Sequence, residues 1–164
     1  MNTDVYIGID PDSEKSGFAL LINNEIETYK VSFSDFIFTW LKKIHAMEKK
    51  YNSVTVFVEG SWLLKGFYWR HIYNNNPNVL KKISYDIGIN HAIGKKIVEI
   101  LEHEKINVKT VEPLKLEKKI NTYELLDVCK RNSITLHFPI TNQEERDSAH
   151  LVISYSKQKK NPEI

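Results

Sequence analysis

The chain has one cysteine, little net charge and no long apolar segment, and each of these features excludes some classes of protein. It has 164 residues and one cysteine, Cys129, so an internal disulfide and a multi-cysteine zinc site are both excluded. The formal net charge is only +2, so any basic surface must come from local clustering of lysine and arginine. The sequence has no apolar run of membrane length and no signal peptide, which predicts a cytoplasmic protein with no membrane partner.

Length and hydrophobic content indicate one folded unit. Hydrophobic residues make up 41% of the chain, which is enough for one sizeable core and leaves little room for a second. We therefore expect a single domain over residues 1–164. Its last stretch, KQKKNPEI at 157–164, is rich in lysine and is expected to be a flexible tail.

Hydrophobic periodicity predicts a mixed α/β fold, with a five-stranded sheet flanked by helices. The first three strands should form an antiparallel meander, because Asn23–Asn24 suits a tight hairpin. Ser34 is a suitable N-cap for the first helix, and Asn121 with Glu124 makes a capping-box pattern for a later one. Strands are predicted at 4–10, 17–23, 25–31, 54–58 and 106–111, and helices at 34–49, 84–103, 122–131 and from about 142–144 to 157.

Two of the predicted strands end on acidic residues. The apolar run Val5–Ile9 ends on Asp10, and the run Val54–Val58 ends on Glu59. If these strands are neighbours, both carboxylates lie at one edge of the sheet. A single strand-end acid could merely cap a turn, but burying unpaired carboxylates is costly, so the pair favours a bound cation.

A third acidic group lies in NQEERDSAHLVISY, residues 142–155. Glu144, Asp147 and His150 are spaced three apart and share one helical face. Packed across the sheet, this helix would bring its acids over Asp10 and Glu59, and hard divalent cations would relieve the repulsion. We therefore predict a metal site for Mg²⁺, with two ions per site, formed by Asp10, Glu59, Glu144 and Asp147.

The fourth group of this site stays open between Glu144 and His150. Glu144 and Asp147 together would place both acids near the helix start, where the helix dipole favours negative charge, and Mg²⁺ prefers carboxylate oxygens. The imidazole of His150 suits Mn²⁺ better, or it could orient the attacking water without binding metal. Glu145 and Arg146 are expected at the surface.

Three segments, IGIDPDSEKSGFALL, VTVFVEGSW and EERDSAHLVISY, resemble in order and spacing the RuvC-type Holliday junction resolvases of the RNase H-like superfamily. The resemblance covers nearly the whole chain and implies an RNase H-like sheet, with Asp10 as first metal ligand, Glu59 as second and Asp147 as last. It implies an endodeoxyribonuclease of DNA recombination and repair. Such an enzyme is a homodimer that cuts four-way DNA junctions symmetrically by phosphodiester hydrolysis, with Mg²⁺ or Mn²⁺.

The sequence also departs from the family. Asp12 stands where the first motif usually has glycine, although aspartate is among the few residues that tolerate a left-handed turn. The stretch VEPLKLEKKI resembles the region after the family's fifth strand, where lysines serve the nucleic acid, so Lys118 and Lys119 are predicted DNA contacts. It lacks the glycines common in cellular resolvases, which favours a viral or mobile-element origin.

Residues 61–82 have no regular helical or strand periodicity of apolar residues, and they contain many aromatic and basic side chains. This segment follows Glu59 and should border the metal site, so we predict a DNA-contacting insert. Aromatic rings stack on unpaired bases, worth about 1–3 kcal/mol per base, and basic side chains hold phosphates. A satellite core or a subunit interface is the alternative for the aromatic residues. The predicted contacts are Lys65, Phe67, Trp69, Arg70, Lys81 and Lys82.

Other functions compete with junction cleavage. An RNase H-like nuclease acting on RNA or an RNA–DNA hybrid would share the metal site. A non-catalytic relative that binds branched DNA would require a lost ligand, whereas Asp10, Glu59 and Asp147 are all present. A sugar-kinase or actin-like ATPase needs two such domains around its nucleotide, and 164 residues are too few.

Overall fold

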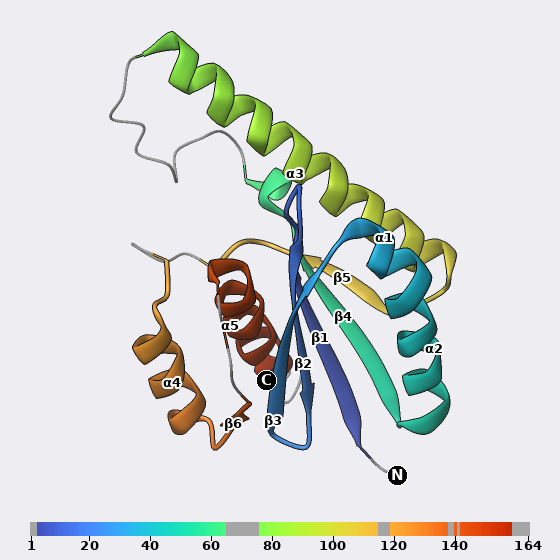
Figure 1. The fold of residues 1–164 in the computed structure, drawn as a ribbon. Helices are drawn as coiled ribbons and strands as arrows, with labels where there is room; N and C mark the ends of the chain where they lie inside the picture. The colour runs from blue at the N-terminus through green and yellow to red at the C-terminus, as the bar shows by residue number, and fades with distance from the viewer. Residues whose placement is uncertain (1–2, 65–75, 115–118, 138–139, 141, 159–164) are drawn as a thin grey trace.

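A mixed β-sheet forms the centre of the molecule (Figure 1). The computed structural model describes residues 3–64, 76–114, 119–137, 140 and 142–158. Within these residues, six strands pair in the order β5-β4-β1-β2-β3-β6. Their bounds are β1 Asp4–Asp10, β2 Ser16–Ile22, β3 Glu25–Val31, β4 Ser53–Glu59, β5 Val108–Val111 and β6 Thr135–Leu136.

The strand directions confirm the predicted α/β, RNase H-like fold class. β1, β2 and β3 form an antiparallel meander, while β4 pairs parallel with β1 and β5 pairs parallel with β4. Asn23 and Asn24 make the β2–β3 turn with φ angles of 51° and 65°, a left-handed conformation that asparagine tolerates. The hairpin predicted from these two asparagines is therefore confirmed.

The prediction of five strands was one strand short. β6 pairs parallel with the start of β3, where Glu25 lies opposite Thr135 and Ile26 opposite Leu136. Two residues are too few to display the alternation by which a strand is recognised in a sequence. The extra strand is the outermost strand beside β3, and it does not alter the order of the strands that carry Asp10 and Glu59.

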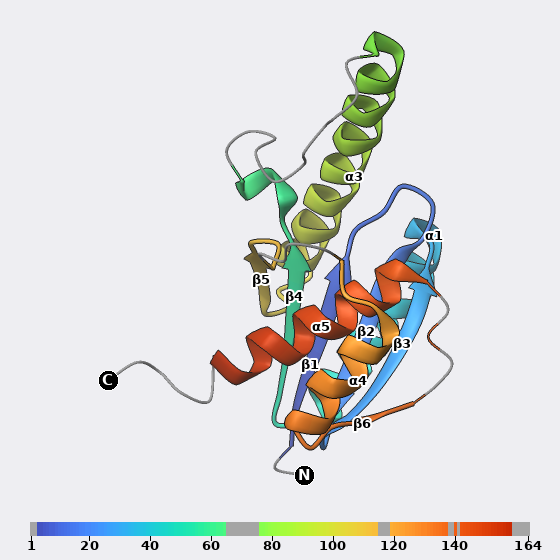
Figure 2. The same ribbon diagram turned by 90° about the vertical axis from the view of Figure 1, so that its left-hand side faces the viewer.

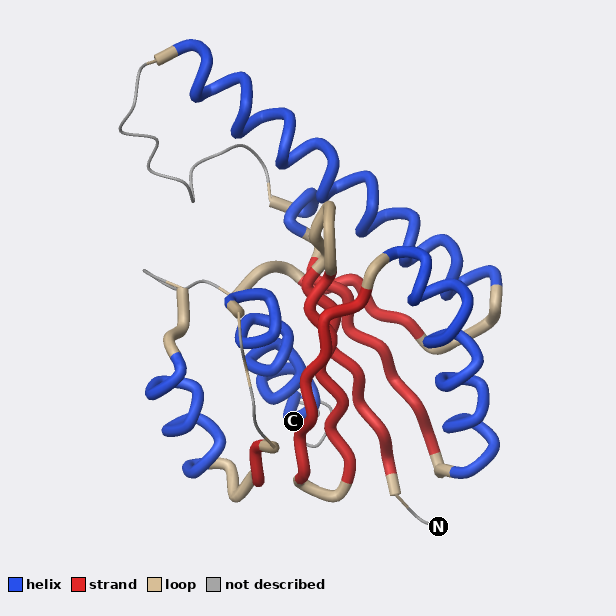
Figure 3. Tube along the Cα trace, viewed as in Figure 1, coloured by secondary structure: helices blue, strands red, loops and turns tan. Residues whose placement is uncertain are grey.

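Helices cover both faces of the sheet (Figure 3). α2 and α3 lie on one face, and α4 and α5 lie on the other. The helical bounds are α1 Phe33–Asp35, the π-helical turn η1 Phe36–Trp40, α2 Leu41–Lys50, the 3₁₀ turn η2 Ser61–Leu63, α3 Pro77–His103, α4 Thr122–Arg131 and α5 Gln143–Gln158.

Alternation along the strands divides the apolar side chains between two cores. On the α2–α3 face, Ile7 of β1 is fully buried in the same cluster as Ile44 and Leu101. On the α4–α5 face, Tyr6 of β1 stacks on Phe57 of β4, with ring centroids 6.2 Å apart. Burial on both faces explains why β1 and β4 read as continuous apolar runs.

The first helix begins earlier than its predicted N-cap. Ser32, not Ser34, caps it, because the Ser32 hydroxyl oxygen accepts a hydrogen bond from the backbone N–H of Asp35 at 3.1 Å. The two serines are alike in sequence, and only one has the extended backbone that a cap requires.

The start of α3 was predicted too late. The helix begins at Pro77, not at residue 84, and is capped by Asn76, whose side chain accepts from the N–H of Asn78 at 3.0 Å. Asn76–Pro77 interrupts the apolar pattern, yet proline at the first helical position is a start signal, since its missing N–H would have no helical partner there. Part of the predicted insert 61–82 is therefore helical.

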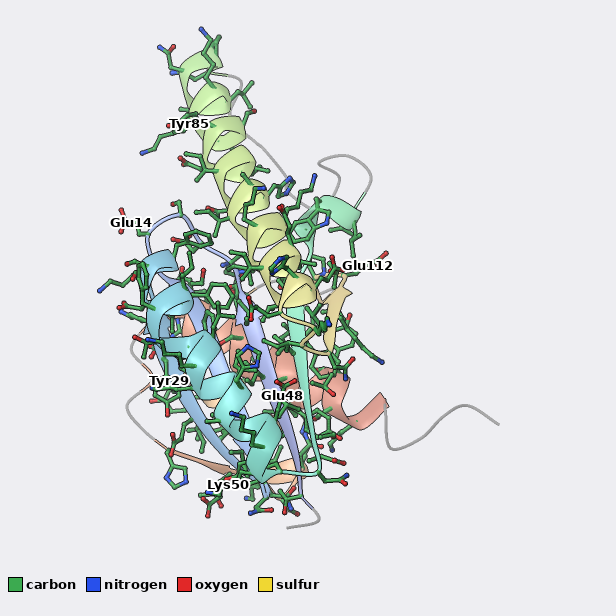
Figure 4. The ribbon with its side chains drawn as sticks, turned by 90° about the vertical axis from the view of Figure 1, so that its right-hand side faces the viewer. Glu14, Tyr29, Glu48, Lys50, Tyr85 and Glu112 are labelled. Atoms are coloured by element: carbon green, nitrogen blue, oxygen red, sulfur yellow. The ribbon has the colours of Figure 1, made fainter. Side chains whose placement is uncertain are left out.

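α3 extends well beyond the sheet (Figure 2). Tyr85 lies on the projecting part, where it is 69% exposed (Figure 4). Closer to the sheet, Gly94 lets the helix approach Trp62 and Pro11, whereas Gly88 faces open space. Of the helices in the described part of the chain, none is both long enough and apolar enough to cross a membrane.

Candidate metal centre

Asp10 and Glu59 lie at the same edge of the sheet. β1 and β4 are parallel, and Ile9 pairs with Val58, so the next residue of each strand is one of the two acids. The carboxyl ends of neighbouring parallel strands meet at one edge, and this confirms that the two residues are adjacent as the sequence predicts. Glu59 continues into the pairing with β5, opposite Val111.

α5 reaches this edge because two glycines let it lie directly on the sheet. Gly17 pairs with Asp10 in the β1–β2 ladder, and a Cβ placed on Gly17 would lie 2.0 Å from the backbone oxygen of Glu144. Gly8 makes a second close approach, in which a Cβ would lie 2.5 Å from the backbone oxygen of Ser148. The first turns of α5 are thus held against the strand next to Asp10.

A capping box fixes the start of α5. The Asn142 side chain accepts from the backbone N–H of Glu145 at 2.9 Å, and the Glu145 carboxylate accepts from the backbone N–H of Asn142 at 3.1 Å. The prediction that Glu145 lies at the surface was wrong: it is 5% exposed. Arg146 is also partly buried rather than a surface residue, and it donates to Gln143 at 2.9 Å.

Charge repulsion among the carboxylates is strong. Burial raises the pKa of Asp10 well above its ordinary value, and the charges of Glu59, Asp147 and Glu144 raise it further. Burial, followed by the charge of Asp147, raises the pKa of Glu59 to about 7. The acids predicted to share a site therefore do act on one another in the folded chain.

Lys119 supplies a positive charge to this group. Its ammonium donates to Asp147 Oδ2 at 3.0 Å, and it lowers the pKa values of Asp10 and Glu59. The Lys119 side chain is 67% exposed, so its desolvation is only partial; this opposes the charged form, but Asp147, Asp10 and Glu144 together outweigh it and raise the lysine pKa. The sequence predicts this lysine as a DNA contact, and that role stays a prediction.

Gln143 is a site residue that the sequence analysis missed. Its Nε2 donates to Asp147 Oδ1 at 2.7 Å and to the backbone oxygen of Ile120 at 3.1 Å. A signal was present, because glutamine and aspartate four residues apart on a helix are suitably spaced for a hydrogen bond. Asp147 thus receives a hydrogen bond on each of its two oxygens, and its side chain is 16% exposed.

His150 lies one helical turn beyond Asp147. Burial lowers its pKa, the Asp147 carboxylate opposes that shift, and Arg131 adds to it. The neutral imidazole is therefore favoured, which is the form that can accept a proton or bind metal. This placement leaves the choice between Glu144 and His150 as the fourth group open.

The donor chemistry fits a divalent cation. Among the residues that the structure describes, no three histidine, cysteine, aspartate or glutamate side chains are close enough together to hold a metal ion as they stand. Coulombic effects reach farther than coordination bonds, so the mutual pKa shifts above are compatible with that spacing. Carboxylate oxygens are the ligands that Mg²⁺ prefers, and a divalent cation would relieve the repulsion at Asp10 and Glu59.

The remaining predicted DNA contacts divide into two groups. Lys81 and Lys82 are exposed on the projecting part of α3. The others lie outside the described residues, and these are Lys65, Phe67, Trp69, Arg70 and Lys118.

The metal-free protein should lose stability as pH rises from about 4.5 to about 7. The ordinary pKa of Glu59 is 4.5 and its folded-state pKa is about 7, so the folded state binds the proton more tightly. The stabilisation by this proton is fully present below pH 4.5 and is lost as pH passes through about 7. The loss attributable to Glu59 is at most about 3 kcal/mol.

Urea denaturation in EDTA, at about pH 5 and about pH 8, measures this difference. The variant Glu59→Gln should show a smaller difference, because the titrating group is gone. An equal pH dependence in the unmodified chain and in Glu59→Gln would contradict the burial and charge coupling that act on Glu59.

Comparison with known proteins gives structural similarity without sequence similarity. No protein-family model matches the chain, and no curated protein matches its sequence. RuvC of T. thermophilus in complex with a Holliday junction substrate is similar at a TM-score of 0.49 and 14% identity, over 96% of both chains. A second Thermus thermophilus RuvC structure gives a TM-score of 0.44 and 14% identity, again over 96% of both chains.

The large terminase nuclease of the thermophilic phage G20c, solved with bound magnesium, is also similar. Its TM-score is 0.43 and its identity 11%, over 93% of this chain and 81% of the nuclease chain. The fold assignment itself depends on the strand order and strand directions of the sheet.

Proposed function

We propose that this protein is a metal-dependent nuclease that cuts branched DNA, resolving four-way junctions as a homodimer. The observation that carries the proposal is the set of mutually repelling carboxylates at one edge of the sheet. Asp10 ends β1, Glu59 ends β4, and α5 brings Glu144 and Asp147 to them. Buried acids of like charge with strongly shifted pKa values are typical of catalytic sites.

The proposed metal ligands are Asp10, Glu59, Asp147 and Glu144, with His150 as the alternative fourth group. The proposed ions are Mg²⁺ or Mn²⁺, two per site. When bound, such ions activate water for attack on a phosphodiester and stabilise the leaving oxygen. The chain's own contribution is to bring the carboxylates of β1, β4 and α5 to one edge of the sheet, where bound cations would favour their ionised forms.

Other side chains of the site have distinct proposed roles. Lys119 stays near the acids and can contact a phosphate of the scissile strand. A neutral His150 can accept a proton or orient water. Lys81 and Lys82 on α3 can hold the phosphates of a DNA arm, together with the predicted contacts in the insert after Glu59.

Four-way junctions are the proposed substrate because of the three sequence segments that resemble RuvC-type resolvases. A junction offers two symmetric strands to cut, and one domain over residues 1–164 would carry one site, so paired cutting calls for a two-fold dimer. The same resemblance supports a role in recombination and repair. The single cysteine favours the cytoplasm, and the absence of the family's glycines from VEPLKLEKKI favours a viral or mobile-element setting.

A substrate panel tests the proposal. With Mg²⁺ or Mn²⁺, the protein should cut a four-way junction at two symmetric positions, faster than a three-way junction, a flap, a duplex, a single strand or an RNA–DNA hybrid. Cleavage should stop in EDTA. Preference for an RNA–DNA hybrid would instead favour the alternative RNase H-like activity, and no cleavage of any substrate with either ion would overturn the proposal.

A further inference from the structure

The side-chain amide of Gln143 lies between α5 and the segment that carries Lys119. One amide nitrogen has two hydrogens, and here it has two acceptors: Asp147 Oδ1 at 2.7 Å and the backbone oxygen of Ile120 at 3.1 Å. Ile120 follows Lys119 directly in the chain and is 5% exposed. Gln143 therefore contacts both the carboxylate and the main chain beside the lysine that faces it.

The third partner of Gln143 fixes which way its amide points. Gln143 Oε1 accepts a hydrogen bond from Arg146 Nη2 at 2.9 Å. A guanidinium can only donate, while a carboxylate and a carbonyl can only accept, so exchanging the nitrogen and oxygen of the amide would break all three hydrogen bonds. The three hydrogen bonds together therefore require the NH₂ group of Gln143 to face Asp147.

The consequence is that the two oxygens of Asp147 are held by different groups. Oδ1 receives the neutral amide of Gln143, and Oδ2 receives the ammonium of Lys119. An amide can orient a carboxylate without adding charge, whereas a glutamate at position 143 would add another negative group to a site that already holds several. Donors of this kind behind a metal ligand typically affect metal affinity by about 10–100-fold.

We propose that Gln143 is a positioning residue, which orients Asp147 for divalent-cation binding and ties α5 to the chain beside Lys119. Arg146 acts through it, by holding the amide in the required orientation. The inference rests on the proposed metal-dependent function, because Asp147 is taken to be a ligand. It adds a residue that neither strand-end acids nor the resemblance to resolvases indicates.

The test is Mn²⁺ binding measured by calorimetry without DNA, on the full chain. Gln143→Met keeps the length and helix propensity of the side chain and removes its donors. We expect Mn²⁺ affinity to fall by about 10-fold or more, and cleavage to recover at high Mn²⁺ concentration. Gln143→Asn, which keeps the amide but shortens its reach, should weaken binding likewise and replaces the methionine variant if that one does not fold.

Asn142→Ala is the matched control, since it removes the cap of the same helical turn and leaves both donors to Asp147 in place. It should lower thermal stability with no change in Mn²⁺ affinity. Equal Mn²⁺ affinity in Gln143→Met and the unmodified chain, or an equal loss in Asn142→Ala, would overturn the positioning role. Failure of the unmodified chain to bind Mn²⁺ would overturn the proposed metal centre, and with it this inference.

Discussion

Asp10→Asn should abolish DNA cleavage and leave binding of a four-way junction intact. Loss of a carboxylate ligand removes several kcal/mol of transition-state stabilisation, so the rate should fall by more than about 1000-fold. DNA binding depends mainly on phosphate contacts by basic side chains, which this substitution does not touch. Cleavage rates with Mg²⁺ and gel-shift affinities on the same junction measure the two effects separately.

The same variant should be more stable than the unmodified chain when metal is absent. Asp10 is buried among acids that raise its pKa, so its charge is unfavourable at neutral pH. Asparagine has nearly the same shape and no charge. A rise in melting temperature at about pH 8 in EDTA, together with lost cleavage, would therefore separate loss of a ligand from misfolding.

Asp12→Asn is the matched control for this experiment. Asp12 lies two residues along the same loop, where it accepts from the backbone N–H of Glu14 at 2.9 Å and faces Asn90 of α3. It should keep cleavage near the unmodified rate. Full activity of a pure Asp10→Asn protein would refute the metal site, and inactivity of Asp12→Asn would show that the loss of cleavage is not specific to the carboxylate of Asp10.

The sheet and its acids were predictable because the signals are local and repeated. β1 and β4 are buried on both faces, so each reads as an unbroken apolar run whose end is marked by its acid. The β2–β3 turn was marked by two asparagines. These features do not depend on contacts with distant parts of the chain.

What the sequence did not reveal depends on partners far apart along the chain. Glu145 is an exception: Asn142 lies only three residues before it, with the same spacing as Asn121 and Glu124, so this capping box could have been predicted from the sequence. The hydrogen bond of Gln143 to Asp147 is local, but its bond to the backbone of Ile120 joins residues 23 apart, and Lys119 faces Asp147 across 28 residues. Spacing along one helix predicts which side chains share a face, but not which loop lies over that face.

The close approach of α5 to the sheet could not be predicted from the sequence either, because a glycine in a strand does not indicate which element packs against it. A Cβ on Gly17 would be 2.0 Å from the Glu144 backbone oxygen and 3.0 Å from the Glu144 Cβ. Real Cβ atoms do not approach a backbone atom so closely, so α5 would have to move away from β2. Gly17 thus decides whether Glu144 can reach the edge of the sheet at Asp10.

Gly17→Ala should therefore cause a large loss of both stability and cleavage. Overpacking usually costs about 1–3 kcal/mol, and here the atoms that obstruct the new methyl group belong to a helix backbone, so we expect more than about 3 kcal/mol. Any protein that still folds should have α5 displaced and weaker Mn²⁺ binding, because Glu144 and Asp147 move with the helix. Urea denaturation and calorimetry measure the two losses.

Gly88→Ala is the control, because it makes the same chemical change where nothing lies within 4 Å of the new methyl group. Gly88 is inside α3, so alanine there should raise stability by about 0.5–1 kcal/mol through helix propensity. The two substitutions are thus expected to have opposite signs. If Gly17→Ala were as stable as Gly88→Ala, α5 would not lie against β2 as closely as described. The explanation of how Glu144 comes close to Asp10 would then be wrong.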